Sequence, residues 1–156
     1  MQVIIFDDAQ QVAKSAADWV VELINKKPNP VLGLATGSTP ISLYKELVNK
    51  HNASELTFNN TTSFNLDEYL GIDENNAQSY RHFMNVNLFD HVDIDKANTF
   101  LPTCNQGENP RKQGLDYEDK IAQAGGIDLQ ILGIGANGHI GFNEPTSSLA
   151  SRTRIK

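Results

Sequence analysis

The chain has 156 residues, enough for one domain of ordinary size with a buried core. Hydrophobic residues make up 39% of it, as in globular proteins, and a net charge of −6 without a basic stripe argues against a nucleic-acid binder. No apolar run could cross a bilayer, residues 1–10 do not resemble a secretory signal, and the single cysteine, Cys104, permits no internal disulfide, so we expect a cytoplasmic protein.

The N-terminal part of the chain predicts two strands, each followed by a helix. Residues 3–6 form a short apolar run that favours a strand, and Asp8 can cap the helix after it. That helix has an apolar stripe at spacings of three and four residues, made of Ala13, Ala16, Ala17, Val20 and Ile24. Residues 31–35 predict a second strand, and Thr39 before Pro40 predicts a helix start with a hydroxyl N-cap.

The rest of the chain continues the alternation. Strands are expected at 61–66, 99–101 and 127–133, a helix opening at Ser79, and a helix over 116–124 that ends at two glycines. Continuous apolar strands joined by amphipathic helices indicate an α/β fold with an open, mostly parallel, Rossmann-like sheet and helices on both faces. No further strand is visible after Pro145, so we expect residues 1–156 to form one α/β domain that lacks its C-terminal part.

Ligands of open parallel sheets bind at the carboxyl ends of strands, and three stretches of this chain occupy such positions. The first is TGSTP at 36–40. Gly37 permits a tight turn, while Ser38 and Thr39 add hydroxyls beside the free amides of a helix N-terminus, a setting that favours a phosphate. The lysine of a Walker A loop is absent. An ordinary capped turn between strand and helix is the alternative interpretation.

The second stretch is FNLDEYLG, in which Asp67 and Glu68 follow the strand at 61–66. Neighbouring strand residues point to opposite faces, so these two carboxylates are not expected to act as one catalytic dyad. One of them can face the cleft as a catalytic group. A surface turn ending at Gly71, or an N-cap, is the alternative.

The third stretch is ILGIGANGHIGFNEP at 131–145, in which glycines allow the backbone to approach a ligand closely. His139 is the one histidine in such a setting, and Glu144 can accept a hydrogen bond from its ring, which would fix the tautomer. The pattern is neither a dinucleotide fingerprint, nor a zinc-protease motif, nor a serine-hydrolase elbow. A histidine–glutamate pair with a separate aspartate, Asp67, indicates proton transfer.

Together these stretches resemble the glucosamine-6-phosphate deaminase family, also called glucosamine-6-phosphate isomerase. The resemblance runs through LGLATGSTPISLYKEL, FNLDEYLGI, SYRHFM, LFDHVDI, GIGANGHIGFNEP and SSLASRTRIK. The related 6-phosphogluconolactonases usually continue the glycine–histidine turn with a Ser-Leu-Phe-Pro type of segment, whereas this chain has Phe-Asn-Glu-Pro at 142–145. That difference favours the deaminase over the lactonase.

The resemblance implies conversion of glucosamine 6-phosphate and water to fructose 6-phosphate and ammonia, without metal or organic cofactor. In the family, the histidine at the position of His139 moves a proton from O1 to O5 during ring opening, and the glutamate at the position of Glu144 orients this histidine. The aspartate at the position of Asp67 takes the proton from C2 and delivers it to C1. Some members have an aspartate where this chain has Asn137, a difference expected to change the pH optimum and not the reaction. The phosphate binds at the positions of Gly37, Ser38 and Thr39.

The basic tail carries a second implication of the resemblance. In allosteric members, the positions of Ser147, Arg154 and Lys156 contribute to a site for N-acetylglucosamine 6-phosphate between subunits; a solvated tail is the alternative. The implied partner is a small sugar phosphate, and neither a nucleic acid nor a membrane is expected. A homo-oligomer is possible. Two other functions compete: lactone hydrolysis on the same fold, and a sugar-phosphate sensor, which would not need the pair of His139 and Glu144.

Overall fold

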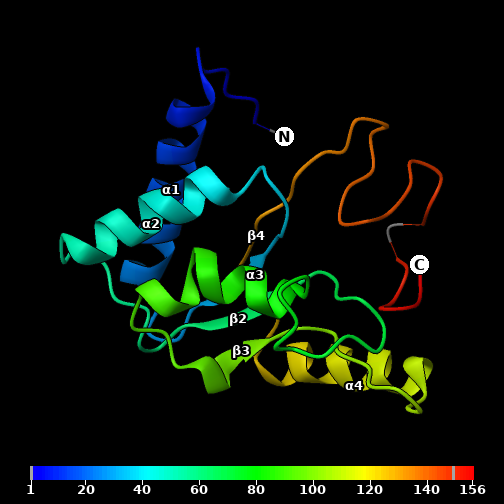
Figure 1. The fold of residues 1–156 in the computed structure, drawn as a ribbon. Coiled ribbons are helices and arrows are strands. Elements are labelled where there is room, and N and C mark those ends of the chain that lie inside the picture. Colours follow the sequence, from blue (N-terminus) through cyan, green and yellow to red (C-terminus); the bar gives the residue numbers. More distant parts are fainter. Residues whose placement is uncertain (1, 149) are drawn as a thin grey trace.

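A computed structural model describes residues 2–148 and 150–156 (Figure 1). Four strands form one sheet in the order β3-β2-β1-β4, and every neighbouring pair is parallel. The strands are β1 (Val31–Leu34), β2 (Thr62–Asn65), β3 (Thr99–Phe100) and β4 (Leu129–Gln130). The helices are α1 (Ala9–Lys26), α2 (Ile41–Asn52), α3 (Tyr80–Asn87) and α4 (Pro110–Gln123), with two short 3-10 turns, η1 (Phe89–His91) and η2 (Lys96–Asn98).

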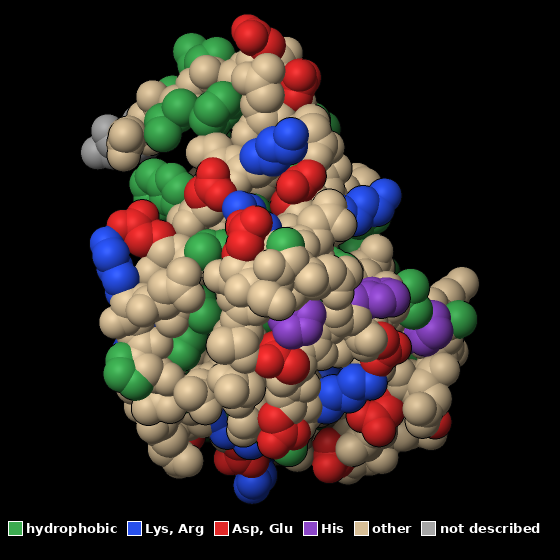
Figure 2. All heavy atoms as spheres, turned by 90° about the vertical axis from the view of Figure 1, so that its left-hand side faces the viewer, with side chains coloured by type: hydrophobic (Ala, Val, Ile, Leu, Met, Phe, Trp, Pro, Cys, Tyr) green, Lys and Arg blue, Asp and Glu red, His purple; other side chains and the backbone are tan. Residues whose placement is uncertain are grey.

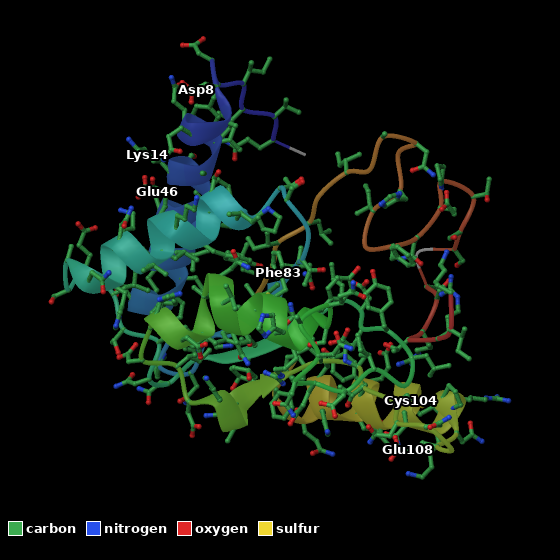
Figure 3. All side chains as sticks on the ribbon, viewed as in Figure 1. Asp8, Lys14, Glu46, Phe83, Cys104 and Glu108 are labelled. Atoms are coloured by element: carbon green, nitrogen blue, oxygen red, sulfur yellow. The ribbon has the colours of Figure 1, made fainter. Side chains whose placement is uncertain are left out.

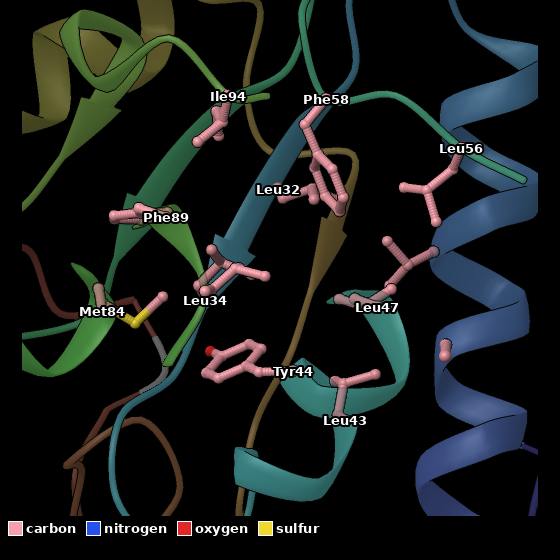
Figure 4. Packing of buried hydrophobic residues seen from close by; sticks show 13 residues of the cluster. Leu32, Leu34, Leu43, Tyr44, Leu47, Leu56, Phe58, Met84, Phe89 and Ile94 are labelled. Atoms are coloured by element: carbon pink, nitrogen blue, oxygen red, sulfur yellow. The ribbon is translucent and has the colours of Figure 1, made fainter. Parts of the chain in front are cut away.

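Helices cover both faces of the sheet. The alternate residues of β1 therefore pack against helices on opposite faces. Leu32 and Leu34 belong to the larger cluster of buried side chains, which is built with α1, α2 and α3 (Figure 4). Val31 and Phe64 instead pack with Tyr117 of α4. Burial of these aliphatic and aromatic groups is the main stabilising term of such a fold. The expected α/β class, with a parallel sheet between helices, is confirmed.

Helix starts follow local capping chemistry. The Asp8 carboxylate accepts a hydrogen bond from the Gln11 backbone N–H at 2.8 Å, as expected for the N-cap of α1 (Figure 3). Ser79 likewise caps α3 through the His82 N–H. The expected cap at Thr39 is wrong, because α2 begins at Ile41 after Pro40 and no side chain caps it.

Helix α4 begins six residues before the predicted start at 116. The Asn109 side chain accepts from the N–H groups of Arg111 and Lys112, and Pro110 occupies the first turn. The apolar periodicity missed this beginning because residues 110–114 are polar and end in Gly114. That glycine has a packing reason: a Cβ on it would lie 2.6 Å from the Thr153 carbonyl oxygen.

Two predicted strands differ in the structure. Residues 2–6 form no strand, and Val3 and Ile5 are 71% and 89% exposed. An apolar run becomes a strand only beside a partner, and the described residues offer none to this segment. The strand expected at 127–133 is reduced to β4, although the Asp128 N–H to Val31 and the Ile131 N–H to Gly33 extend its ladder on both sides.

No helix among the described residues combines the length and apolarity needed to cross a membrane. On the face of the molecule seen in Figure 2, acidic and basic side chains are interspersed, without a single-sign patch.

Candidate active site

The carboxyl ends of β1, β2 and β4 meet at one edge of the sheet. Leu34 at the end of β1 pairs with Asn65 at the end of β2, while β4 pairs with β1 on the other side. The loops that follow are in contact: a Cβ on Gly133 would lie 3.9 Å from the Thr39 hydroxyl, and one on Gly141 would lie 3.8 Å from Leu66. All three predicted stretches therefore share this edge.

Buried polar side chains lock this edge from behind. The hydroxyl of Tyr44, a fully buried residue of α2, donates to the Ala35 carbonyl just after β1. The Asn65 amide donates to the Leu34 carbonyl at 3.1 Å, and the Tyr117 hydroxyl donates to the Asn65 carbonyl at 2.7 Å. Sequence reasoning missed these three residues. Their signal was a polar atom on an otherwise apolar, core-facing position, since such atoms need partners when buried.

The turn at 36–40 leaves its backbone open to solvent. Gly37 has a φ of +92°, a conformation that favours glycine, and Gly37, Ser38 and Thr39 are all exposed. The start of α2 follows directly, and the Ile41 N–H donates to the Ser38 carbonyl at 3.4 Å, so an exposed turn with two hydroxyls lies at the carboxyl end of β1. Such a helix N-terminus suits an anionic group.

Asp67 lies half-buried beside a cleft of about 510 Å³. Burial, and then the neighbouring negative charge of Glu68, raise the pKa of the Asp67 carboxyl above its usual value. The cleft continues from Asp67 to Gly141 and Phe142 of the third stretch, to Cys104 near the N-terminal end of α4 (Figure 3), and to the basic tail. His139 lies outside its lining, so the cleft reaches the edge of the histidine loop only.

Glu68 lines the same cleft as Asp67, but its carboxylate is occupied by backbone N–H groups. Its carboxylate accepts the backbone N–H groups of Tyr69 at 2.9 Å, Tyr80 at 3.0 Å and Arg81 at 3.0 Å. The N-cap alternative for this stretch therefore describes Glu68, while Asp67 faces the cleft. The expectation that the two do not form a dyad agrees with this arrangement.

The third stretch holds His139, Asn137 and Glu144 in a chain of hydrogen bonds. Nδ1 of His139 lies 2.7 Å from Oδ1 of Asn137, and the Asn137 amide nitrogen donates to Glu144 Oε2 at 2.8 Å. The expected direct bond between Glu144 and the imidazole is thus replaced by an amide bridge. Because Oδ1 only accepts, and also takes the His139 backbone N–H at 3.3 Å, the ring proton sits on Nδ1 and Nε2 keeps its lone pair.

Glycine at position 135 makes room for the imidazole. A Cβ on Gly135 would lie 2.2 to 2.5 Å from three atoms of the His139 ring. The loop closes on itself, since the Gly135 N–H donates to the His139 carbonyl at 2.9 Å. The Phe142 ring lies edge-on to the imidazole with centroids 6.1 Å apart. His139 is half-buried, whereas Asn137 and Glu144 are exposed.

The basic tail folds back over α4 and the histidine loop. Glu118 accepts the Thr153 backbone N–H at 2.8 Å and its hydroxyl at 2.9 Å. Lys156 Nζ donates to the Ser147 hydroxyl at 3.4 Å, and Arg154 donates to the Asn143 amide oxygen at 3.4 Å. Two of the three predicted allosteric residues, Ser147 and Lys156, are therefore in contact, and Arg154 lines the same cleft as Asp67.

Comparison with protein families gives a match to the model of glucosamine-6-phosphate isomerases/6-phosphogluconolactonase over residues 7–147. The chain belongs to this family. A glucosamine-6-phosphate deaminase of Colwellia psychrerythraea is 86% identical over all 156 residues, and one of Pseudoalteromonas translucida is 62% identical over the same span. The chain spans 58% of the length of each of these relatives.

Solved structures of this family share the fold. A protein described as a monomeric glucosamine-6-phosphate deaminase superimposes with a TM-score of 0.92 at 38% identity, covering 97% of this chain and 62% of that one. A 6-phosphogluconolactonase from Thermotoga maritima has a TM-score of 0.71 at 24% identity over 89% of this chain and 61% of its own, a likeness of fold alone.

Proposed function

We propose that this chain carries the proton-transfer and phosphate-binding groups of a glucosamine-6-phosphate deaminase. The reaction converts glucosamine 6-phosphate and water to fructose 6-phosphate and ammonia. The observation that carries the proposal is the bridge from His139 through Asn137 to Glu144, on the sheet edge that also bears Asp67. The deaminases named above, at 86% and 62% identity, support the choice of substrate.

His139 opens the sugar ring in this proposal. Its Nδ1–H is held by Asn137, so the free Nε2 lone pair takes the proton from the O1 hydroxyl and returns it to the ring oxygen O5. Glu144 acts through Asn137: its charge orients the amide, and the amide orients the ring. Glycine at 135 lets the imidazole lie against the backbone.

Asp67 moves the proton that makes the isomerisation. It removes the proton from C2 of the open-chain amino sugar and delivers it to C1, and water then releases ammonia from C2. A carboxylate with a raised pKa suits this task, because a general base works best when its pKa lies near the pH at which the enzyme operates. Positioned proton transfer of this kind contributes on the order of 10²–10⁴ in rate.

The phosphate binds at Gly37, Ser38 and Thr39. Their exposed backbone and hydroxyls lie at the N-terminus of α2, where the helix dipole favours a negative group. In this proposal the substrate is a small sugar phosphate, and the reaction takes place in the cytoplasm without a cofactor. Residues 1–156 form one α/β domain of a longer enzyme. Ser147, Arg154 and Lys156 are the residues of this chain that would serve an allosteric site.

The decisive experiment uses the chain completed with the remaining residues of the Colwellia psychrerythraea relative, called the completed enzyme below. It should release ammonia from glucosamine 6-phosphate, and Asp67→Asn should abolish release while sugar-phosphate binding persists. Asp119→Asn, the same change at an exposed position of α4, is the control. Turnover of 6-phosphogluconolactone without ammonia release from the amino sugar would replace this function by lactone hydrolysis.

A further inference from the structure

The loop that carries Asp67 is tied to α3 by the side chain next to it. Three backbone N–H groups converge on the Glu68 carboxylate: Tyr69 and Tyr80 on Oε1 and Arg81 on Oε2. Tyr80 and Arg81 are the first residues of α3, whose N–H groups have no partner within the helix. Glu68 therefore fixes its own loop and the helix start in one contact.

Asp67 depends on this contact because its own carboxylate has no hydrogen-bond partner among the described residues. Its position is set by the backbone on either side of it. Leu66 packs toward the histidine loop at Gly141, and the Gly71 N–H donates to the Cys104 carbonyl at 2.8 Å. Between these two points, the Glu68 carboxylate and the stacked pair of Tyr69 and Tyr80 tie the loop to α3.

We propose that Glu68 is a positioning residue that holds the Asp67 loop against the start of α3 and so keeps Asp67 at the cleft. This inference rests on the proposed function. It gives the second carboxylate of FNLDEYLG a task distinct from that of the first: Asp67 exchanges the proton, and Glu68 keeps the base in place without touching substrate.

Glu68 also acts through its charge. Burial and the Glu68 charge raise the pKa of Asp67. The other charged or titratable groups that share the cleft with Asp67 are Tyr69 of its own loop, Tyr80 of α3, Cys104, Glu118 of α4, and Arg152, Arg154 and Lys156 of the tail. The rings of Tyr69 and Tyr80 stack at the cleft, and their hydroxyl oxygens lie 3.2 Å apart.

The test compares three variants of the completed enzyme. Glu68→Gln removes the charge and keeps one acceptor oxygen, while Glu68→Ala removes the charge and both acceptors. Ser79→Ala removes the other cap of α3 together with the hydrogen bond from the Ser79 hydroxyl to the Glu74 carbonyl. We expect Glu68→Gln to move the acidic limb of the kcat/KM profile to lower pH, because Asp67 then loses its proton more easily. Glu68→Ala should lower kcat about 10²-fold, as expected for a base displaced by about 1 Å, with KM little changed. Ser79→Ala should leave both the profile and kcat as in the wild type.

A second readout separates this inference from the proposed function. The titration of the Asp67 carboxyl carbon, followed by NMR in the same proteins, should move to lower pH in Glu68→Gln and stay in place in Ser79→Ala. If the wild-type enzyme released no ammonia but this titration moved, the function would be wrong and the coupling right. An unmoved titration in Glu68→Gln, or equal effects of Glu68→Ala and Ser79→Ala on kcat, would overturn the inference.

Discussion

The amide oxygen of Asn137 lies 2.7 Å from Nδ1 of His139, and the same side chain donates to Glu144. An amide holds one tautomer without adding charge, since its oxygen only accepts and its nitrogen only donates. An aspartate at this position would instead bring a negative charge to the imidazole, and that charge would repel the Glu144 carboxylate. The residue at 137 therefore decides whether a neutral or a charged group faces Nδ1 of the imidazole.

Asn137→Asp should move the pH optimum of ammonia release upward in the completed enzyme, because the new carboxylate favours the protonated imidazole, which cannot act as a base. The pH–rate profile checks this. Asn25→Asp, the same chemical change at the C-terminal end of α1, is the control, because that end of the helix leads into the start of β1 and not its carboxyl end. An unchanged optimum in Asn137→Asp would show that the bridge does not govern the histidine.

Gly135→Ala should lower kcat about 10²-fold, because its Cβ would lie 2.2 to 2.5 Å from the His139 ring and would displace the imidazole. Thermal unfolding should change little, since the loop is mostly exposed. Gly133→Ala is a matched control in the same loop, where the nearest atom to an added Cβ lies at 3.9 Å. Equal kcat in the two variants would contradict the close contact between Gly135 and the ring.

The sequence predicts the sheet and its functional edge well, because buried parallel strands are continuous apolar runs and helix starts have local caps such as Asp8 and Ser79. It fails where a partner far along the chain decides the outcome. Residues 2–6 have the composition of a strand and no partner among the described residues, and Gly114 interrupts the expected pattern of α4 because Thr153 packs on it.

The same distinction applies to the candidate site. Asp67, His139 and Glu144 could be singled out by residue type and place, but the bridge through Asn137 could not, because it depends on how a loop with several glycines closes. The N–H partners of Glu68 on α3 were equally hidden, since Tyr80 and Arg81 follow it by twelve and thirteen positions. Spacing in sequence does not show which helix such a carboxylate caps.

Glu118→Gln should loosen the basic tail. Burial opposes ionisation of Glu118, but the hydrogen bonds from Thr153, together with Arg152, outweigh it and lower the pKa of this carboxyl. Losing the charge weakens those bonds, so trypsin should cut after Arg152 and Arg154 roughly tenfold faster at neutral pH. Asp119→Asn, on the exposed side of the same helix, is the control. Equal cleavage rates in the wild type and Glu118→Gln would mean that the tail is held by other contacts.

Asp128 should make stability depend on pH in the acidic range. Lys27 donates to both of its carboxylate oxygens at 2.6 and 2.7 Å and the Val31 N–H donates at 2.8 Å, so the pKa of Asp128 lies below its ordinary value of 3.8 in the folded chain. A carboxyl whose pKa is lower when folded stabilises fully above pH 3.8, and that contribution disappears as the pH falls through the folded-state pKa.

Asp128→Asn should therefore lower the free energy of unfolding at pH 7 by up to about 1 kcal/mol, the range of partly exposed ion pairs. The difference should shrink as the pH falls below 3.8. Urea unfolding of the wild type and the variant between pH 7 and pH 3 measures this convergence. The amide keeps an acceptor for the Val31 N–H, so the change isolates the charge. A difference in unfolding free energy that stays constant over the whole range would assign the effect to packing at the start of β4 and not to the ion pair.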